Sequence, residues 1–412
     1  MDGNTADNAV VVTHANMRTV AKGMPMLARA ALKTLLDIEK GTLTVQFPNG
    51  VVIRIDGKAP GANARINLRS FDLAKRVVTR GDVGVGESFM DGEWDSPDVA
   101  SVLLLFCENR HLTTARQRKF WSNLLLKFVH WRNENTQKGS KRNISAHYDL
   151  GNAFYKSWLD RTMTYSSALF ENRNMSLEDA QTAKYANLAR QTQIRPDDHV
   201  LEIGCGWGGF AEFAAKEIGC KVTGLTISQE QLEFAQKRIF EAGLNEKVDI
   251  VFRDYREERG HYDRIASIEM FEAVGEKYWP VYFDTLRERL KPGGAAGLQV
   301  ITIRDDMFES YRSKTDFIQR YIFPGGMLPS PGEMVRLGQE RGLTMSAERI
   351  FGHDYADTLA AWCATFKQRW ADIKPLGFDE RFKRMWEFYF YFCEAGFRSE
   401  NIDVRQMVFA KR

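Results

Sequence analysis

The chain has 412 residues, of which 44% are hydrophobic and 12% aromatic, and a formal net charge of +3. This length favours two domains, and the composition excludes a disordered protein. The longest apolar runs fall far short of the roughly 20 residues that span a bilayer. The amino terminus has no signal-peptide pattern, which predicts a cytoplasmic protein. Five scattered cysteines predict neither a disulfide framework nor a metal site.

The first part of the chain, residues 1–131, is predicted to form an α+β domain. It contains no constellation of catalytic residues. Alternating apolar residues on either side of Pro48-Asn49-Gly50, a turn sequence, predict a hairpin. Residues 1–20 are expected to be disordered and residues 24–39 to form a helix. The hairpin strands are predicted at 42–47 and 51–55. Two helices follow, separated by the acidic, glycine-rich segment 81–95.

Positive charge is concentrated between residues 110 and 143, where nine Lys or Arg residues accompany one acid, Glu134. Trp121 and Trp131 lie among them. This mixture is typical of contact with an anionic membrane surface, although a solvated helix and linker would carry the same charge. No nucleic-acid-binding motif is present, so no nucleic-acid partner is expected. The polar residues 132–143 predict a linker before a second domain over 144–412.

In the second domain, strand and helix patterns alternate. This alternation predicts an α/β fold with a parallel sheet that has helices on both faces. The predicted strands are 199–204, 220–226, 248–253, 262–268, 295–303, 344–351 and 402–410. The predicted helices are 208–218, 228–242 and 276–290. In such a sheet, ligands bind beyond the carboxyl ends of the strands, at the switch point after the first strand.

A glycine-rich turn occupies that switch point. The first strand runs into glycines at 204, 206, 208 and 209, after which a helix begins. Such a turn leaves backbone N–H groups free for a nucleotide-like ligand. The pattern also fits NAD, but an NAD protein needs an acid at the end of the next strand, where this chain has Thr226. Glu202 before the turn and Asp254 after the third strand favour S-adenosylmethionine (SAM) instead.

Further motifs resemble those of the cyclopropane-fatty-acyl-phospholipid synthases. One resemblance lies in the first domain, at 81–94 (GDVGVGESFMDGEW), and the others follow in order through the second domain. These others are 147–152 (HYDLGN), 159–160 (LD), 163–168 (MTYSSA), 270–275 (MFEAVG), 321–329 (YIFPGGMLP), 351–355 (FGHDY), 394–398 (EAGFR) and 406–409 (QMVF). The resemblance implies a class I SAM-dependent methyltransferase, Rossmann-like, with a seven-stranded, mostly parallel sheet.

The implied reaction transfers the methyl carbon of SAM to the cis double bond of an acyl chain in a membrane phospholipid. The alkene attacks the electrophilic methyl group, a carbocation forms, and a base removes a proton as a cyclopropane ring closes. Water must be excluded, because it would trap the cation. In the family the base is a bound bicarbonate ion. Its implied holders in this chain are Ser167, Glu272, Gln299, Ile301 (through its backbone) and Tyr355.

Two of these holders depart from the family pattern. Ser167 stands where many members have Cys, and Gln299 stands where many have His. Both can donate a hydrogen bond to an anion, but Gln299 cannot titrate as His does. For SAM, the resemblance and the turn together indicate a larger set of residues. These are Tyr165, Ser166, Glu202, Gly204, Gly206, Thr226, Gln231, Asp254, Tyr255 and Arg256.

Two other functions stay open. The first is a C-methyltransferase of the same family, which would give a methyl-branched or methylene product without ring closure. The second is a non-catalytic, SAM-binding protein of the lipid surface. The resemblance implies an enzyme bound peripherally at the inner face of the membrane. For the amino-terminal domain we expect membrane docking, substrate presentation or formation of a homodimer.

Overall fold

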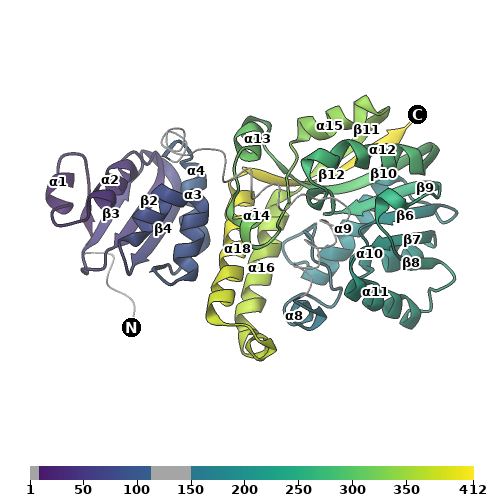
Figure 1. Cartoon of the computed structure of the whole chain (residues 1–412), viewed down its shortest axis with the longest axis horizontal. Coiled ribbons are helices and arrows are strands. Elements are labelled where there is room, and N and C mark those ends of the chain that lie inside the picture. Colours follow the sequence, from purple (N-terminus) through teal and green to yellow (C-terminus); the bar gives the residue numbers. More distant parts are fainter. Residues whose placement is uncertain (1–8, 113–149) are drawn as a thin grey trace. The chain divides into compact units, whose positions relative to one another are not determined.

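The computed structural model describes residues 9–112 and 150–412, and the chain divides into two compact units (Figure 1). Unit 1 comprises Met1–Leu125 and Gly377–Ser399. Unit 2 comprises Leu126–Leu376 and Glu400–Arg412. The predicted linker at 132–143, and most of the basic segment, lie outside the described residues. No helix of the described part of the chain is long and apolar enough to cross a membrane.

Unit 1 contains a five-stranded sheet in the order β1-β3-β2-β4-β5. Its strands are β1 (Val10–Val11), β2 (Lys40–Gln46), β3 (Val52–Asp56), β4 (Ala59–Leu68) and β5 (Trp94–Asp95). Its helices are α1 (Met17–Val20), α2 (Met26–Leu35), α3 (Asp72–Met90), α4 (Val99–Glu108) and α18 (Glu380–Arg398). The antiparallel pair β2–β3 confirms the predicted hairpin.

Two local expectations for unit 1 are wrong. Residues 9–20 are ordered rather than disordered, because β1 pairs in parallel with β3 and α1 follows it. Residues 82–90 of the glycine-rich segment are themselves helical, and Gly81 alone separates them from the helical turns before it in α3. Gly81 absorbs a kink at φ 56°, and the helix beyond it buries Phe89 and Met90. Burial of those apolar side chains outweighs the low helix propensity of the glycines.

Helix α18 lies near the carboxyl end of the sequence but packs with α3 and α4 of unit 1. Chain order alone places these residues in the predicted second domain, 144–412. The buried aromatic face of α18 provides the packing: Trp386, Phe388, Tyr389 and Phe390. Arg384 adds a polar anchor, since it donates to the carbonyl oxygens of Phe89 and Trp94 and to the Asp95 carboxylate, and lies over the Phe89 ring.

Arg384→Met should therefore destabilise unit 1. Methionine keeps the apolar contact with Phe89 but leaves three acceptors without their charged donor, at a cost of about 1–3 kcal/mol. Urea denaturation followed by tryptophan fluorescence measures the change. Lys33→Met, at an exposed position of α2, is the control. Equal stability of the two variants would contradict a role for Arg384 in holding α18.

Unit 2 is an α/β domain with a seven-stranded sheet in the order β11-β12-β10-β9-β6-β7-β8. Only β12 is antiparallel to its neighbours, so the predicted mostly parallel sheet is confirmed. The strands are β6 (His199–Ile203), β7 (Lys221–Thr226), β8 (Val248–Phe252), β9 (Tyr262–Ile268), β10 (Leu290–Ile303), β11 (Leu343–Ile350) and β12 (Ile402–Lys411).

Helices cover both faces of this sheet and connect its strands. The α-helices are α8 (Asn152–Lys156), α9 (Leu177–Thr192), α10 (Gly209–Phe213), α11 (Gln229–Glu241), α12 (Trp279–Arg289), α13 (Asp305–Arg312), α14 (Phe317–Tyr321), α15 (Pro331–Glu340), α16 (Gly352–Gln368) and α17 (Trp370–Ile373). Short η helices are η1 (Ala214–Ile218), η2 (Tyr255–Glu257), η3 (Phe271–Ala273), η4 (Glu276–Tyr278) and η5 (Lys374–Leu376).

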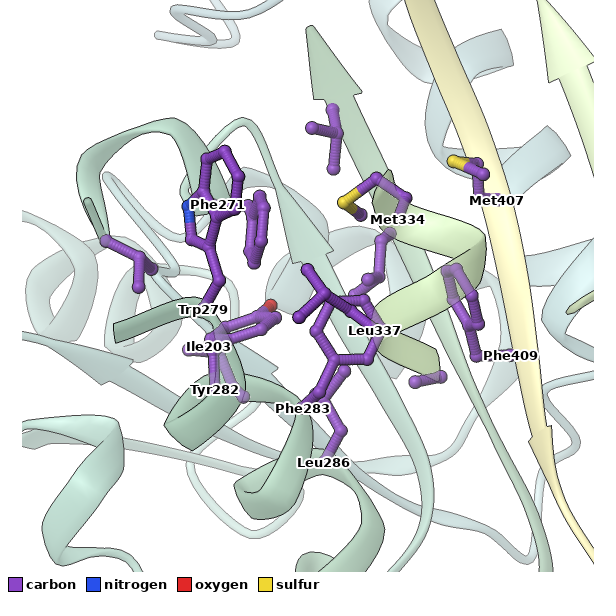
Figure 2. Close-up of a cluster of buried hydrophobic side chains, with 14 of the residues drawn as sticks. Ile203, Phe271, Trp279, Tyr282, Phe283, Leu286, Met334, Leu337, Met407 and Phe409 are labelled. Atoms are coloured by element: carbon purple, nitrogen blue, oxygen red, sulfur yellow. The ribbon is translucent and has the colours of Figure 1, made fainter. Parts of the chain in front are cut away.

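Two hydrophobic cores lie on opposite faces of the sheet, because successive strand side chains point in opposite directions. On β6, Val200 joins one core with α9, α10 and α11, and Leu201 joins the other with α12 and α15. Figure 2 shows the second core, in which Phe271 and Trp279 stack near Tyr282 while Met334 and Leu337 approach Phe409. These cores fix the sheet, and the strand ends carry the polar residues described next.

Candidate active site

The glycine turn connects β6 to α10, as predicted. Gly204, Gly206 and Gly208 all adopt positive φ angles, of 82°, 51° and 80°. A Cβ atom at position 204 would lie 2.6 Å from Cγ of Met270, whereas one at position 206 would meet no atom of the described residues within 4 Å beyond its chain neighbours. The backbone N–H groups of Gly204 and Cys205 donate to the Leu225 carbonyl, which fastens the turn to β7. The space above Gly206 is thus open to a ligand.

Glu202 precedes the turn and is buried. Among the described residues, its Oε2 atom has no hydrogen-bond partner. Burial raises the pKa of Glu202 to about 8, and the charges of Arg238 and Lys184 oppose this rise. A buried carboxyl oxygen without a donor fits a ligand that brings a positive charge or an N–H group, and SAM brings both.

The neighbouring strand ends carry the other residues predicted to bind SAM. Thr226 ends β7, and its hydroxyl donates to Oε1 of Gln231 on α11. Asp254 follows β8, where both of its carboxylate oxygens accept hydrogen bonds from Arg256. The Arg256 guanidinium also lies 5.4 Å from the Tyr255 ring centroid. The sheet therefore brings these five residues to the same edge as the glycine turn.

Glu272 lies in η3, after β9. Its Oε1 atom accepts a 2.5 Å hydrogen bond from the backbone N–H of Ile301 on β10. Its Oε2 atom is buried and has no partner among the residues that the structure describes. Burial raises the pKa of Glu272 to about 8, and the nearby charge of Glu269 contributes in the same direction. Two residues that were expected to hold an external anion thus lie together, but the Ile301 N–H donates to Glu272 itself.

Glu269 was not among the predicted catalytic residues, but it lies between them. Its Oε1 atom accepts hydrogen bonds from the Ser167 backbone N–H at 2.8 Å and from Nε2 of Gln299 at 2.7 Å. Its Oε2 atom accepts one from the Tyr355 hydroxyl at 2.6 Å. Three predicted holders of an external anion therefore converge on a carboxylate that belongs to the chain.

Glu269 has a left-handed backbone conformation, with φ 50°. This conformation costs a non-glycine residue about 1–2 kcal/mol, and strain of this kind is concentrated at functional sites. The one signal available in the sequence was a second acid three residues before Glu272, directly after the β9 pattern. Its contacts with residues 30 to 102 positions away could not be read from that pattern.

Lys184 on α9 is a second buried charge that the sequence analysis missed. Its Nζ atom donates a 2.6 Å hydrogen bond to the hydroxyl of Ser166. This bond fixes the position of Ser166, which is predicted to bind SAM. Burial lowers the pKa of Lys184 to about 7, whereas the charges of Glu269, Asp160 and Glu202 oppose this change. Lys184 thus places positive charge near the buried acids of the site.

A chain of amides fixes the orientation of Gln299. Gln299 and Gln406 are register partners on β10 and β12, and Nε2 of Gln406 donates to Oε1 of Gln299 at 3.0 Å. The carbonyl side of the Gln299 amide is therefore occupied, and its NH₂ group is turned toward Glu269. Asn187 in turn donates to Oε1 of Gln406.

Aromatic rings surround Tyr165, which is half-buried beside Ser166 and Ser167. Its ring centroid lies within 5.3–6.3 Å of four other rings: Tyr155, Trp158, Trp362 and Phe323. Such a cluster excludes water, and its faces can stabilise positive charge. Phe271 lies outside this cluster and packs in the core against Trp279 and Tyr282.

The fold and this site define a class I SAM-dependent methyltransferase. Residues 135–407 match the family described as mycolic acid cyclopropane synthetase, and the chain belongs to that family. Among solved structures, the mycolic acid cyclopropane synthase CmaA1 complexed with SAH and CTAB superposes with a TM-score of 0.62. It is 29% identical and covers 66% of this chain and 98% of its own.

Two relatives extend the similarity to most of the chain. The tuberculostearic acid methyltransferase UfaA1 of Mycobacterium tuberculosis is 38% identical over 342 residues, which is 81% of this chain and 80% of that protein. The cyclopropane-fatty-acyl-phospholipid synthase of Escherichia coli K12 is 36% identical over 368 residues, 87% of this chain and 90% of that protein. The family resemblance expected from the motifs is thus confirmed.

Proposed function

We propose that this enzyme transfers the methyl carbon of SAM to the cis double bond of an unsaturated acyl chain in a membrane phospholipid, with closure of a cyclopropane ring. The observation that carries this proposal is the pair of buried carboxyl groups of Glu269 and Glu272, beside the glycine turn and an aromatic cluster. A cationic intermediate needs nearby negative charge, a base and the exclusion of water.

For SAM, the residues of unit 2 fit the cofactor. Gly204 and Gly206 would let SAM approach the backbone of the turn closely. Glu202 would accept a hydrogen bond from its cationic end, and Thr226 and Gln231 would supply neutral hydrogen bonds. Asp254, Tyr255 and Arg256 would lie along the adenine, with Tyr165 and Ser166 near the reacting end. When bound, SAM supplies an electrophilic methyl carbon, and its transfer leaves a carbocation on the acyl chain.

A bound bicarbonate does not fit the residues as they are arranged. The Ser167 N–H, the Gln299 amide and the Tyr355 hydroxyl donate to Glu269, and the Ile301 N–H donates to Glu272. The Ser167 hydroxyl donates to the Ala168 carbonyl. An added anion would have to displace a carboxylate and then lie beside it, and like charges at such separations repel strongly in a buried site.

A second candidate function is C-methylation without ring closure. Two observations favour it: Gln299 cannot titrate as the histidine of many family members does, and one relative is named a tuberculostearic acid methyltransferase. Both reactions would take place at the inner membrane face, where the basic and aromatic residues between 110 and 143 would bind anionic lipid. In either case the protein acts on lipid as a peripheral enzyme.

Incubation of the full chain with labelled SAM and vesicles of a defined monounsaturated phospholipid tests both candidates. Ring and methylene products have the same mass, so proton NMR of the extracted lipid is required. A high-field signal of the ring methylene supports cyclopropane formation. An olefinic methylene signal supports the second candidate. Absence of label from the lipid, with SAM still bound, would show a non-catalytic SAM-binding protein of the lipid surface.

A further inference from the structure

We propose that Glu269 is the catalytic base of this enzyme and takes the position that the family resemblance gives to bicarbonate. This inference rests on the proposed function, because it concerns the proton lost after methyl transfer. It predicts that the reaction proceeds without bicarbonate. The donors that would hold an external anion hold the Glu269 carboxylate instead.

The lone pairs of the Glu269 carboxylate indicate which atom accepts the proton. Each carboxylate oxygen can accept about two hydrogen bonds. Oε1 has both of its donors, from the Ser167 backbone and the Gln299 amide, at 2.8 and 2.7 Å. Within the described ranges, Oε2 has one donor, the Tyr355 hydroxyl, at 2.6 Å. Oε2 therefore keeps an acceptor site for a proton from the substrate.

The proton transfer balances without any further reactant. The C–H bond of the transferred carbon breaks, and its electron pair forms the second carbon–carbon bond of the ring. The proton goes to Oε2 of Glu269, and the electron pair that it leaves behind neutralises the positive charge of the acyl chain. The same base also serves the methylene product, for which the electron pair forms a carbon–carbon double bond after a hydride has moved between the two former alkene carbons.

The surroundings of Glu269 suit a base of moderate strength. Burial raises its pKa, whereas the charge of Lys184 and the hydrogen bonds from Tyr355, Gln299 and Ser167 oppose the rise. The Glu269 backbone is left-handed, with φ 50°, and its N–H donates to the Gln299 carbonyl at 2.8 Å. Together these features fix the position of the Glu269 backbone from which the side chain extends. The Gln406–Gln299 pair then fixes one of its donors.

The test compares wild type, Glu269→Gln and Glu269→Gly in buffers freed of carbon dioxide and then supplied with bicarbonate. Glycine suits the positive φ angle and removes the carboxylate while leaving its donors free. We expect wild-type turnover to be unchanged by bicarbonate and turnover of both variants to fall by about 100-fold or more. Added bicarbonate should restore part of the activity of Glu269→Gly only. Glu241→Gln, on the surface of α11, is the matched control.

Wild-type turnover that depends on bicarbonate, or a Glu269→Gln variant with wild-type kcat, would overturn the assignment. A second readout needs no turnover: NMR of ¹³C-labelled bicarbonate should detect binding to Glu269→Gly and none to wild type. Wild-type binding of bicarbonate would also overturn it. If wild type transfers no label to phospholipid, the proposed function fails, whereas the binding measurement still tests whether Glu269 fills the anion site.

Discussion

Replacing Glu272 by Gln should lower kcat for methyl transfer by about 10²–10³-fold and leave SAM affinity unchanged. Glutamine has the same size and keeps an oxygen to accept from the Ile301 N–H, which Glu272 accepts at 2.5 Å. It removes only the negative charge at Oε2, an atom with no partner among the described residues. In the proposed reaction that charge would stabilise the carbocation, which forms only after SAM has reacted.

The pH profile separates this role from a structural one. Burial raises the pKa of Glu272 to about 8, with Glu269 as a charged neighbour and Tyr282 a further titratable group near it. Because only the deprotonated form carries the charge, kcat should rise with pH up to about 8 and then level off. The Gln variant should lack this rise. Glu276→Gln is the control, since Glu276 pairs with Arg312 at the surface. Wild-type kcat in Glu272→Gln would contradict the role.

The sequence was sufficient to predict the sheet of unit 2 and the edge at which the site lies. Alternating strand and helix patterns specify parallel strands, and parallel strands bring their carboxyl ends to one edge. Gly204, Thr226 and Asp254 could therefore be assigned to a common site although they lie far apart in the sequence. The motifs then indicated Glu272, Gln299 and Tyr355 at that edge.

Glu269 could not be assigned by the same reasoning, because its function depends on backbone conformation and on donors from three other segments. A left-handed φ at a glutamate is not encoded in a hydrophobic pattern, and Ser167, Gln299 and Tyr355 approach it only after the sheet and α16 have formed. The role of Lys184 could not be predicted for a related reason. Helical periodicity places Lys184 on the inward face of α9 but does not indicate what it contacts.

Helix α18 illustrates a limit of periodicity. The spacing of Trp386, Tyr389 and Phe390 indicates that one face of the helix is buried, and these side chains are buried. The pattern does not say against which surface they pack. Arg384, whose acceptors lie on Phe89, Trp94 and Asp95, carries that information. These partners are nearly 300 positions away in the sequence. Helix α18 therefore belongs to unit 1, although chain order placed it in the second domain.

Substitution of Gly206 should weaken SAM binding while the protein stays folded. Gly206 has φ 51°, and a Cβ atom built there would meet no described residue within 4 Å other than its chain neighbours. Gly206→Ala introduces the cost of a left-handed non-glycine residue, about 1–2 kcal/mol, and one methyl group toward the ligand. Gly206→Val adds bulk at the same point. We expect SAM affinity, measured by calorimetry, to fall about tenfold for Ala and 100-fold or more for Val, since each factor of ten costs about 1.4 kcal/mol.

Gly243→Ala separates backbone strain from loss of the ligand site. Gly243 follows α11 with φ 68°, and a Cβ atom there would also meet nothing within 4 Å. Alanine at either position should therefore lower thermal stability by a similar amount, because the backbone cost is the same. Only substitution at 206 should weaken SAM binding. If Gly206→Val and Gly243→Ala bind SAM with equal affinity, the backbone strain that they share would account for any loss of affinity relative to wild type. That result would contradict a cofactor site above the glycine turn.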